Sequence, residues 1–193
     1  NYKRQVLRIY VLVLGNTGIR TGVEMSNLKW KDITEEKLTK KQIQARQEQG
    51  QREAGSETYL RFRVKGKTSV SEAEGFRNVI ARDAVKGWLK QLTEIGGYPS
   101  DDKDAYVFSM PDGSQIKDLP NMFTTLLEQA DLRYDTQGEP RTLYSMRHMY
   151  ATMCISKGIS FQVLAKHMGT SVEMIERHYG HNKIDEWAVE LAG

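Results

Sequence analysis

Two arginines, Arg20 and Arg147, stand beside the apolar starts of predicted helices, where solvated residues are less expected. Arginine suits phosphate chemistry because its planar guanidinium stays charged and can pair with two oxygens at once. An enzyme that breaks a phosphodiester without a metal needs such charge around the phosphate, and it needs a nucleophile. The sequence contains no clustered Asp pairs and no Cys/His spacing typical of a metal site. We therefore expect phosphodiester chemistry that uses neither a metal nor a cofactor.

Short motifs around these arginines follow one another along the chain. They are Thr-Gly-Ile-Arg at 17–20, Leu-Lys-Trp-Lys-Asp-Ile at 28–33, Lys-Gly-Lys-Thr at 65–68, Thr-Leu-Tyr-Ser-Met-Arg-His at 142–148, Met-Gly-Thr-Ser at 168–171 and Ile-Glu-Arg-His-Tyr at 175–179. Their combination resembles the catalytic domain of tyrosine recombinases, the phage-integrase-like enzymes, over nearly the whole chain. The ordered set is far more specific than any one motif alone.

The resemblance implies roles for particular residues. Arg20 and Arg147 match the two catalytic arginines, which would clamp the scissile phosphate and stabilise its pentavalent transition state. Tyr179 matches the nucleophile that forms a covalent 3′-phosphotyrosine intermediate. Lys67 resembles the hairpin lysine that can act as general acid on the leaving 5′-oxygen, and Lys65 is the alternative within the same motif. Because the phosphotyrosine link keeps the energy of the broken bond, rejoining would need no ATP.

The chain departs from the family pattern at a few positions. Tyr144 stands where the family has a histidine before the second arginine, and Thr170 stands at the later His or Trp position. Tyr144 could still hydrogen-bond the phosphate, but an unperturbed tyrosine pKa of about 10 makes it a poor base at neutral pH. Glu24 follows Arg20 one position later than the acidic residue that the family often has, which leaves its supporting role open. We expect slower or differently tuned chemistry.

The histidines are candidates to replace a missing one. His148 is expected to support helix packing, whereas His167, His178 and His181 could be enlisted at the site. His178 precedes Tyr179 directly, and immediate neighbours on a helix point to different faces. We therefore do not expect His178 to touch the same phosphate as Tyr179.

These residues need a scaffold, and the apolar periodicity predicts a mainly α fold with a small antiparallel β-sheet, in the α+β class. Helices are predicted at residues 2–14, 23–30, 35–56, 83–95, 119–130, 142–156, 161–167, 172–179 and 184–191. A mobile insertion is the alternative for the polar residues 35–56, and residues 31–33 lead towards a short strand or turn. Residues 58–64 and 76–80 carry the β-formers of a hairpin. The resemblance implies the architecture of a tyrosine recombinase catalytic domain.

The length of 193 residues suits one domain, and we expect a single catalytic domain over residues 1–193. Because the chain starts at Asn1 in helix-like sequence, we expect a trimmed fragment, and the resemblance implies an N-terminal DNA-clamping domain that is absent here. The tail at 180–193 carries Ile184, Trp187 and Leu191 at helical spacing. In the family such a tail often packs on a neighbouring protomer, so it is either an exchange segment or a part of its own domain's packing.

The cellular location follows from a few absences in the sequence. Cys154 is the only cysteine, no signal peptide is visible, and no apolar run reaches the roughly 18 residues of a membrane helix. These features favour a reducing, cytoplasmic compartment without membrane attachment. The resemblance implies a DNA-associated protein in a bacterial or phage-infected cell.

The net charge of +3 and the pI near 8.9 permit nucleic-acid binding without establishing it. Basic residues that flank the motifs are candidate contacts to DNA phosphates. They are Lys29, Lys31, Arg61, Arg63, Lys65, Arg141 and Lys166. The resemblance implies double-stranded DNA attachment sites as partners and a homo-tetramer on DNA held together by tail exchange.

Three functions are compatible with these motifs. The first is a site-specific recombinase that integrates or excises a mobile element. The second is a type IB topoisomerase-like enzyme that relaxes one duplex, and the third is a catalytically weakened DNA-binding relative. The motifs at 17–20 and 169–171 favour the first over the second, and the retention of Arg20, Arg147 and Tyr179 argues against the third.

Overall fold

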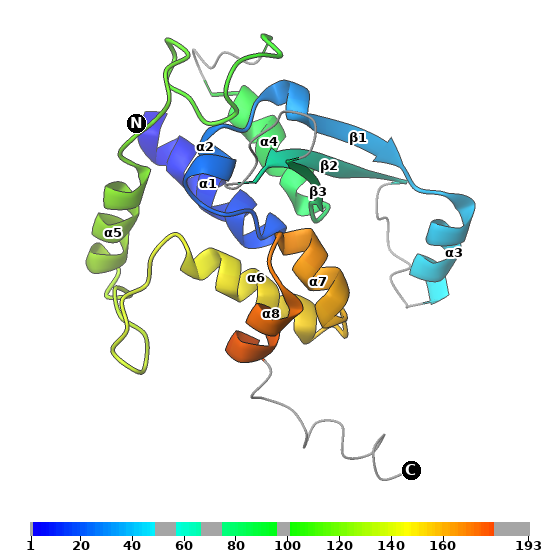
Figure 1. Ribbon diagram of the computed structural model, residues 1–193. Coiled ribbons are helices and arrows are strands. Elements are labelled where there is room, and N and C mark those ends of the chain that lie inside the picture. The colour runs from blue at the N-terminus through cyan, green and yellow to red at the C-terminus, as the bar shows by residue number, and fades with distance from the viewer. Residues whose placement is uncertain (1, 49–56, 67–74, 96–100, 180–193) are drawn as a thin grey trace.

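The computed structural model describes residues 2–48, 57–66, 75–95 and 101–179. The helices are α1 (Tyr2–Thr17), α2 (Val23–Ser26), α3 (Lys40–Glu48), α4 (Ala84–Thr93), α5 (Leu119–Gln129), α6 (Ser145–Ile155), α7 (Phe161–Met168) and α8 (Val172–Tyr179), with a 3-10 turn, η1, at Trp30–Asp32. The strands are β1 (Ile33–Lys37), β2 (Thr58–Lys65) and β3 (Phe76–Ile80). The predicted α+β class is confirmed (Figure 1).

The strands form one antiparallel sheet in the order β1-β2-β3. Phe62 lies at the centre of the register, opposite Ile33 on one side and Val79 on the other. The predicted hairpin at 58–64 and 76–80 is therefore confirmed, and β1 adds a third strand to the sheet.

The third strand corrects the predicted helix over residues 35–56. Residues 33–37 form β1, and the helix in this region, α3, begins only at Lys40. β1 is an edge strand, where charged side chains are suitable because one face and one edge meet water. Glu36 of β1 pairs with Arg61 of β2, so a cross-strand ion pair supports a segment whose composition reads as helical.

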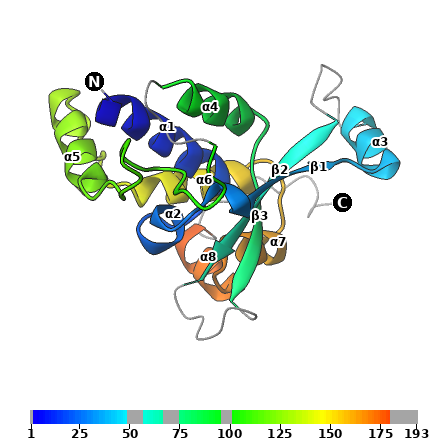
Figure 2. The same cartoon turned by 90° about the horizontal axis from the view of Figure 1, so that it is seen from above.

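Helix α1 is the centre of the larger core and packs against α4, α5 and α6. Its apolar residues recur at helical spacing, so one broad face is buried, including Val6, Tyr10 and Val13. Seen from above, α1 crosses the molecule with α4 on one side and α6 beneath it (Figure 2). This places the C-terminal end of α1, and the motif at 17–20, in the middle of the protein.

Helices α6, α7 and α8 enclose a second, smaller core. Its buried residues are Tyr150, Ala151, Cys154, Leu164, Ala165, Met168 and Ile175. These helices gather below α1 and the sheet in Figure 1. Met146 belongs to the larger core and Tyr150 to the smaller one, so Arg147 lies at the boundary between the two cores. Among the described residues, no helix has both the length and the apolar character needed to cross a bilayer.

Candidate active site

The C-terminal end of α7 organises the site. Gly169 adopts a left-handed conformation with φ 65°, which ends the helix and which residues with a Cβ rarely adopt. The backbone N–H of Thr170 then turns back to donate to the carbonyl of Ala165 at 3.0 Å. The carbonyl oxygens of residues 167–169 are left to accept from side chains, as the last carbonyls of a helix must.

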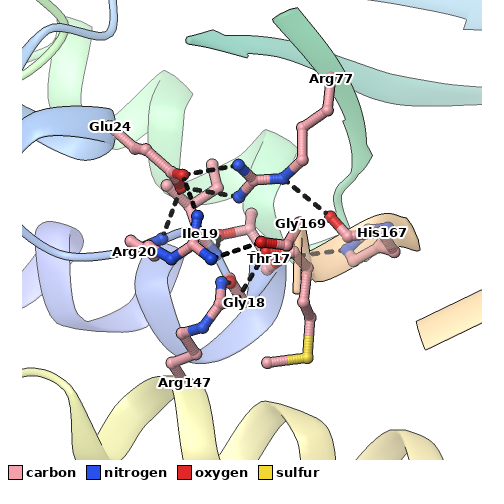
Figure 3. Close-up of polar contacts among 10 residues, drawn as sticks. Thr17, Gly18, Ile19, Arg20, Glu24, Arg77, Arg147, His167 and Gly169 are labelled. Atoms are coloured by element: carbon pink, nitrogen blue, oxygen red, sulfur yellow. Dashed lines mark hydrogen bonds and ion pairs between the residues drawn. The ribbon is translucent and has the colours of Figure 1, made fainter. Parts of the chain in front are cut away.

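Each of these consecutive carbonyl oxygens accepts a hydrogen bond from a different arginine (Figure 3). Arg77 Nε donates to His167 at 3.0 Å, Arg147 Nη2 donates to Met168 at 2.6 Å, and Arg20 Nη2 donates to Gly169. The partial negative charge at a helix C-terminus stabilises cations placed there. The two arginines predicted from sequence are therefore brought together, from ends of α1 and α6 that are far apart in the chain.

Arg147 is nearly covered, with an exposed fraction of 3%. Its Nη1 donates to the carbonyl of Gly18, so two backbone oxygens orient the guanidinium. Burial, and next the positive charge of Arg20, lower the pKa of Arg147 to about 10. Arg147 therefore remains charged at neutral pH and is held in one orientation.

Arg20 is the more accessible arginine, with 32% of its side chain exposed. Glu24 accepts from the backbone N–H of Arg20 and from its Nη1, both at 2.9 Å. Between them Gly22 has φ 80°, a conformation that turns the chain so that the carboxylate returns to Arg20 despite the additional residue. The supporting role of Glu24, which the spacing left open, is thus visible in the contacts.

Arg77 is a residue that the sequence motifs did not identify. Its Nη1 and Nη2 donate to the two carboxylate oxygens of Glu24, each at 2.6 Å, and the Glu24 side chain is 1% exposed. Burial alone would raise the pKa of Glu24, but hydrogen bonds and charge from Arg77, and then from Arg20, lower it overall. A usable signal was present, because Arg77 shares a strand face with buried Val79.

Tyr179 lies at the end of α8 with its hydroxyl 2.5 Å from Nδ1 of His148. His148 follows Arg147 on α6, so Tyr179 reaches the same end of α6 as the second arginine. The sequence assigned His148 to helix packing, and its contact with Tyr179 of α8 adds a polar interaction to that expectation. Burial raises the pKa of Tyr179 to about 12, with Tyr144 adding to the increase and Arg147 opposing it.

The protonation of His148 also departs from that of a solvated histidine. Burial lowers its pKa below the ordinary value of 6.5, and the nearby His178 and Arg147 lower it further. The His178 ring centroid lies 6.0 Å from that of His148, and His178 is exposed. The imidazole that contacts Tyr179 is therefore neutral at physiological pH and can accept a proton.

The positions that depart from the family pattern lie around these groups. Tyr144 precedes α6, is 45% exposed, and places its ring 5.0 Å from that of His148. Thr170 follows the carbonyl that holds Arg20. His167 is stacked on Tyr150, and its Nε2 lies 3.0 Å from the carbonyl oxygen of Thr17. Both contacts of this imidazole are therefore structural contacts within the fold. Lys67 and His181 lie outside the described residues.

The sequence model of the phage integrase family matches residues 2–186. This chain belongs to the phage integrase family. The match spans nearly the whole chain and includes every motif described above, so the resemblance is confirmed. A comparison with curated protein sequences found no match.

Solved structures of integrase-like proteins share the fold of this family member. XerH site-specific recombinase bound to its difH substrate has a TM-score of 0.65 and 21% identity, covering 99% of this chain and 46% of the XerH chain. The Tn1549 transposon integrase in complex with transposon right end DNA has a TM-score of 0.58 and 19% identity, covering 97% of this chain and 58% of that one. A lambda integrase dimer bound to a core site has a TM-score of 0.59 and 17% identity, covering 95% and 47%. The chain thus spans about half the length of these relatives.

Several of the candidate DNA contacts of this integrase-family chain gather beside the arginines. Lys29, Lys31, Arg63 and Lys65 line a pocket of about 330 Å³, which Glu24 also lines. The side chain of Lys31 pairs with Asp104 at 2.5 Å.

The remaining candidates lie elsewhere on the fold. Arg61 pairs with Glu36, and Lys166 is exposed on α7. Arg141 donates to the carbonyls of Leu132 and Tyr134 within its own loop.

Proposed function

We propose that this chain is the catalytic domain of a site-specific DNA recombinase that cuts and rejoins DNA through a 3′-phosphotyrosine link at Tyr179. The observation that carries the proposal is the approach of the Tyr179 hydroxyl to His148, directly beside the clamped Arg147. The names of the solved relatives support it, since they are recombinases and integrases in complexes with DNA. Membership of the phage integrase family supports integration or excision of a mobile element as the biological outcome.

In the cleavage step the Tyr179 oxygen attacks the scissile phosphorus, and its proton passes to Nδ1 of His148. The bond from phosphorus to the 5′-oxygen breaks, and Lys67 protonates that oxygen. One phosphodiester is exchanged for another, so no ATP is consumed. A second DNA end with a free 5′-hydroxyl reverses the step and joins the strands.

The arginines stabilise the charge that develops on the non-bridging oxygens. Arg20 meets a phosphate that arrives from solvent first, because its side chain is 32% exposed. The buried Arg147 adds positive charge beneath Arg20. Tyr144 and Thr170 each supply a hydroxyl that donates to the phosphate. These neutral groups replace histidines of the family pattern, so proton transfer depends on His148.

The test is a covalent-adduct assay with full-length protein. A suicide substrate that contains the attachment site and a nick traps the adduct, with ATP omitted and a chelator present to test metal independence. Adduct formation that is lost in Tyr179→Phe and kept in Tyr134→Phe, an exposed loop tyrosine, supports the proposal. Relaxation of any plasmid without a specific site would favour the topoisomerase, and absence of adduct would favour the weakened relative.

We further propose that residues 1–193 act as one catalytic unit on DNA in the cytoplasm and that the tail at 180–193 joins neighbouring protomers into a tetramer. A groove of about 690 Å³ between α1 and α5 supports this, since Leu7, Met122 and Leu126 form its apolar floor. Lys3, Arg4 and Arg8 also line it, together with Asp118, which pairs with Lys3. The tail has matching apolar residues and the acidic residues Asp185, Glu186 and Glu190.

Substitution of the groove tests tail exchange. Leu126→Asp should abolish assembly of four protomers on DNA while leaving single-site binding intact, as measured by mass photometry. Leu132→Asp is the matched control, because Leu132 is similarly exposed but lies outside the groove. Equal assembly by both variants would refute exchange through this groove.

A further inference from the structure

Arg77 lies on β3, the return strand of the hairpin, yet all of its polar contacts point into the site (Figure 3). Each nitrogen of its guanidinium donates a hydrogen bond: Nε to the carbonyl of His167, and Nη1 and Nη2 to Glu24. Only 15% of the side chain is exposed. All three nitrogens of Arg77 are thus already engaged inside the protein, which favours an effect on the reaction that passes through its partners.

The first partner is the carboxylate of Glu24, which Arg77 and Arg20 share. The same Oε1 accepts from Arg77 at 2.6 Å and from Arg20 at 2.9 Å, and Oε2 accepts from Arg77 and from the backbone N–H of Arg20. A bidentate pair fixes both the position and the plane of a carboxylate. Arg77 thus sets the direction in which Glu24 presents its oxygens to Arg20.

The second partner is the turn that ends α7. The Arg77 side chain covers Gly169 so closely that a Cβ at this position would meet Cδ of Arg77 at 2.9 Å. The carbonyls that follow His167 hold Arg147 and Arg20. Arg77 donates to the carbonyl of His167 and covers Gly169. It thereby fixes the turn whose carbonyls accept from Arg147 and Arg20.

We propose that Arg77 is a positioning residue for strand cleavage, which orients Arg20 through Glu24 and ties the hairpin to the turn at Gly169. The inference rests on the proposed function. The proposal gives the hairpin a second role besides carrying the candidate general acid. The two roles lie close together, because Lys65 of β2 pairs with Phe76, the neighbour of Arg77 on β3. Strand β3 and the arginine pair are then linked through one side chain.

The test compares Arg77→Lys with wild type in single-turnover cleavage and in DNA affinity. Lysine keeps the charge but cannot hold both oxygens of Glu24 and a carbonyl at once. We expect cleavage roughly 10- to 100-fold slower, as for a misplaced catalytic group, with affinity changed less than about twofold. Arg46→Lys is the matched control, because Arg46 pairs with Asp83 away from the site.

A double-mutant cycle separates positioning from folding. In an Arg20→Ala background the Arg77→Lys defect should be clearly smaller than in wild type, because the group that Arg77 orients through Glu24 is gone and only the turn that holds Arg147 remains. If Arg20→Ala is too slow to measure, a methylphosphonate at the scissile position serves instead. It lacks the charge that Arg20 counters, so the Arg77→Lys defect should shrink with it.

Two results would overturn the inference. A defect of equal size with and without Arg20 would mean that Arg77 acts through general stability. A weaker DNA affinity together with a smaller slope of log affinity against log salt would mean that Arg77 binds a phosphate itself. Absence of adduct in wild type would instead defeat the proposed function. Wild-type adduct formation with an equally fast Arg77→Lys would defeat this inference alone.

Discussion

The hydroxyl of Tyr179 lies 2.5 Å from Nδ1 of His148. This hydrogen bond joins the hydroxyl of the proposed nucleophile to an imidazole whose pKa is lowered by burial. Tyr144, which occupies the usual histidine position of the family, lies against the same imidazole with a ring distance of 5.0 Å. We therefore propose His148 for the part that the sequence left without a residue.

His148→Ala should slow single-turnover cleavage by roughly 100-fold or more, the usual contribution of a positioned general base. The pKa of His148 lies below 6.5, so the wild-type rate should be flat through neutral pH and fall as His148 becomes protonated in acid. The alanine variant should lack this acidic limb. An unchanged limb in the variant would assign the titration to another group.

His178→Ala should move the acidic limb without removing it. The electrostatic effect of His178 lowers the pKa of His148, so loss of that ring should raise the pKa of His148 and shift the limb to higher pH. The pH profile of cleavage measures this directly. A limb at the wild-type position would show that the two rings do not interact in the DNA complex.

Tyr144→Phe should slow cleavage by about 10- to 100-fold, which corresponds to losing a hydrogen bond to a charged group. Phenylalanine keeps the ring contact with His148, so the change reports on the hydroxyl alone. Single-turnover rates at saturating DNA are the measurement. Equal rates for the two proteins would remove Tyr144 from the set of phosphate ligands.

Glu24→Gln should lower the free energy of unfolding by about 3 kcal/mol at neutral pH, because the buried charges of its arginine partners lose their counter-charge. The folded pKa of Glu24 lies below its ordinary value of 4.5. Its contribution is therefore fully present above the unfolded value and is lost as the pH falls through the folded one. Urea unfolding should show the two proteins converging in acid, and a constant difference across pH would contradict the charge-based account.

Gly169→Ala and Gly158→Ala form a matched pair. Both glycines have a positive φ, so alanine costs about 1 kcal/mol of backbone strain at either position. A Cβ at Gly158 meets open space, whereas one at Gly169 meets Arg77 at 2.9 Å. Only Gly169→Ala should also slow cleavage, by roughly 10-fold. Equal cleavage rates in the two variants would show that the turn tolerates displacement.

Lys166→Ala should weaken DNA binding for all sequences alike and reduce the slope of log affinity against log salt by about 1. Lys166 is exposed on α7, next to the turn that holds the arginines. Lys90→Ala, an exposed lysine on α4, is the control. Identical slopes for both variants would place the DNA elsewhere.

The sequence predicted the helix that precedes Arg20 and the helices that carry Arg147 and Tyr179, because apolar periodicity and motif spacing are local properties. It could not predict the pairing of Glu24 with Arg77, which are 53 positions apart and meet only when the sheet closes over α2. The charged edge strand β1 was misread for the same reason, since its partner β2 decides its conformation. The sequence also could not predict the contacts to the carbonyls of residues 167–169, because every residue carries a backbone carbonyl whatever its side chain.

Main-chain carbonyls, which hold the arginines, change differently in evolution from side-chain acceptors. A side-chain acceptor is lost by one substitution, but the oxygens that hold Arg147 belong to the main chain at Gly18 and Met168 and survive any change of side chain. Inheritance of the clamp therefore depends on keeping the course of the backbone, chiefly at the glycines with positive φ. Solved relatives with 17–21% identity share this fold, as expected if the course of the backbone changes less than its side chains.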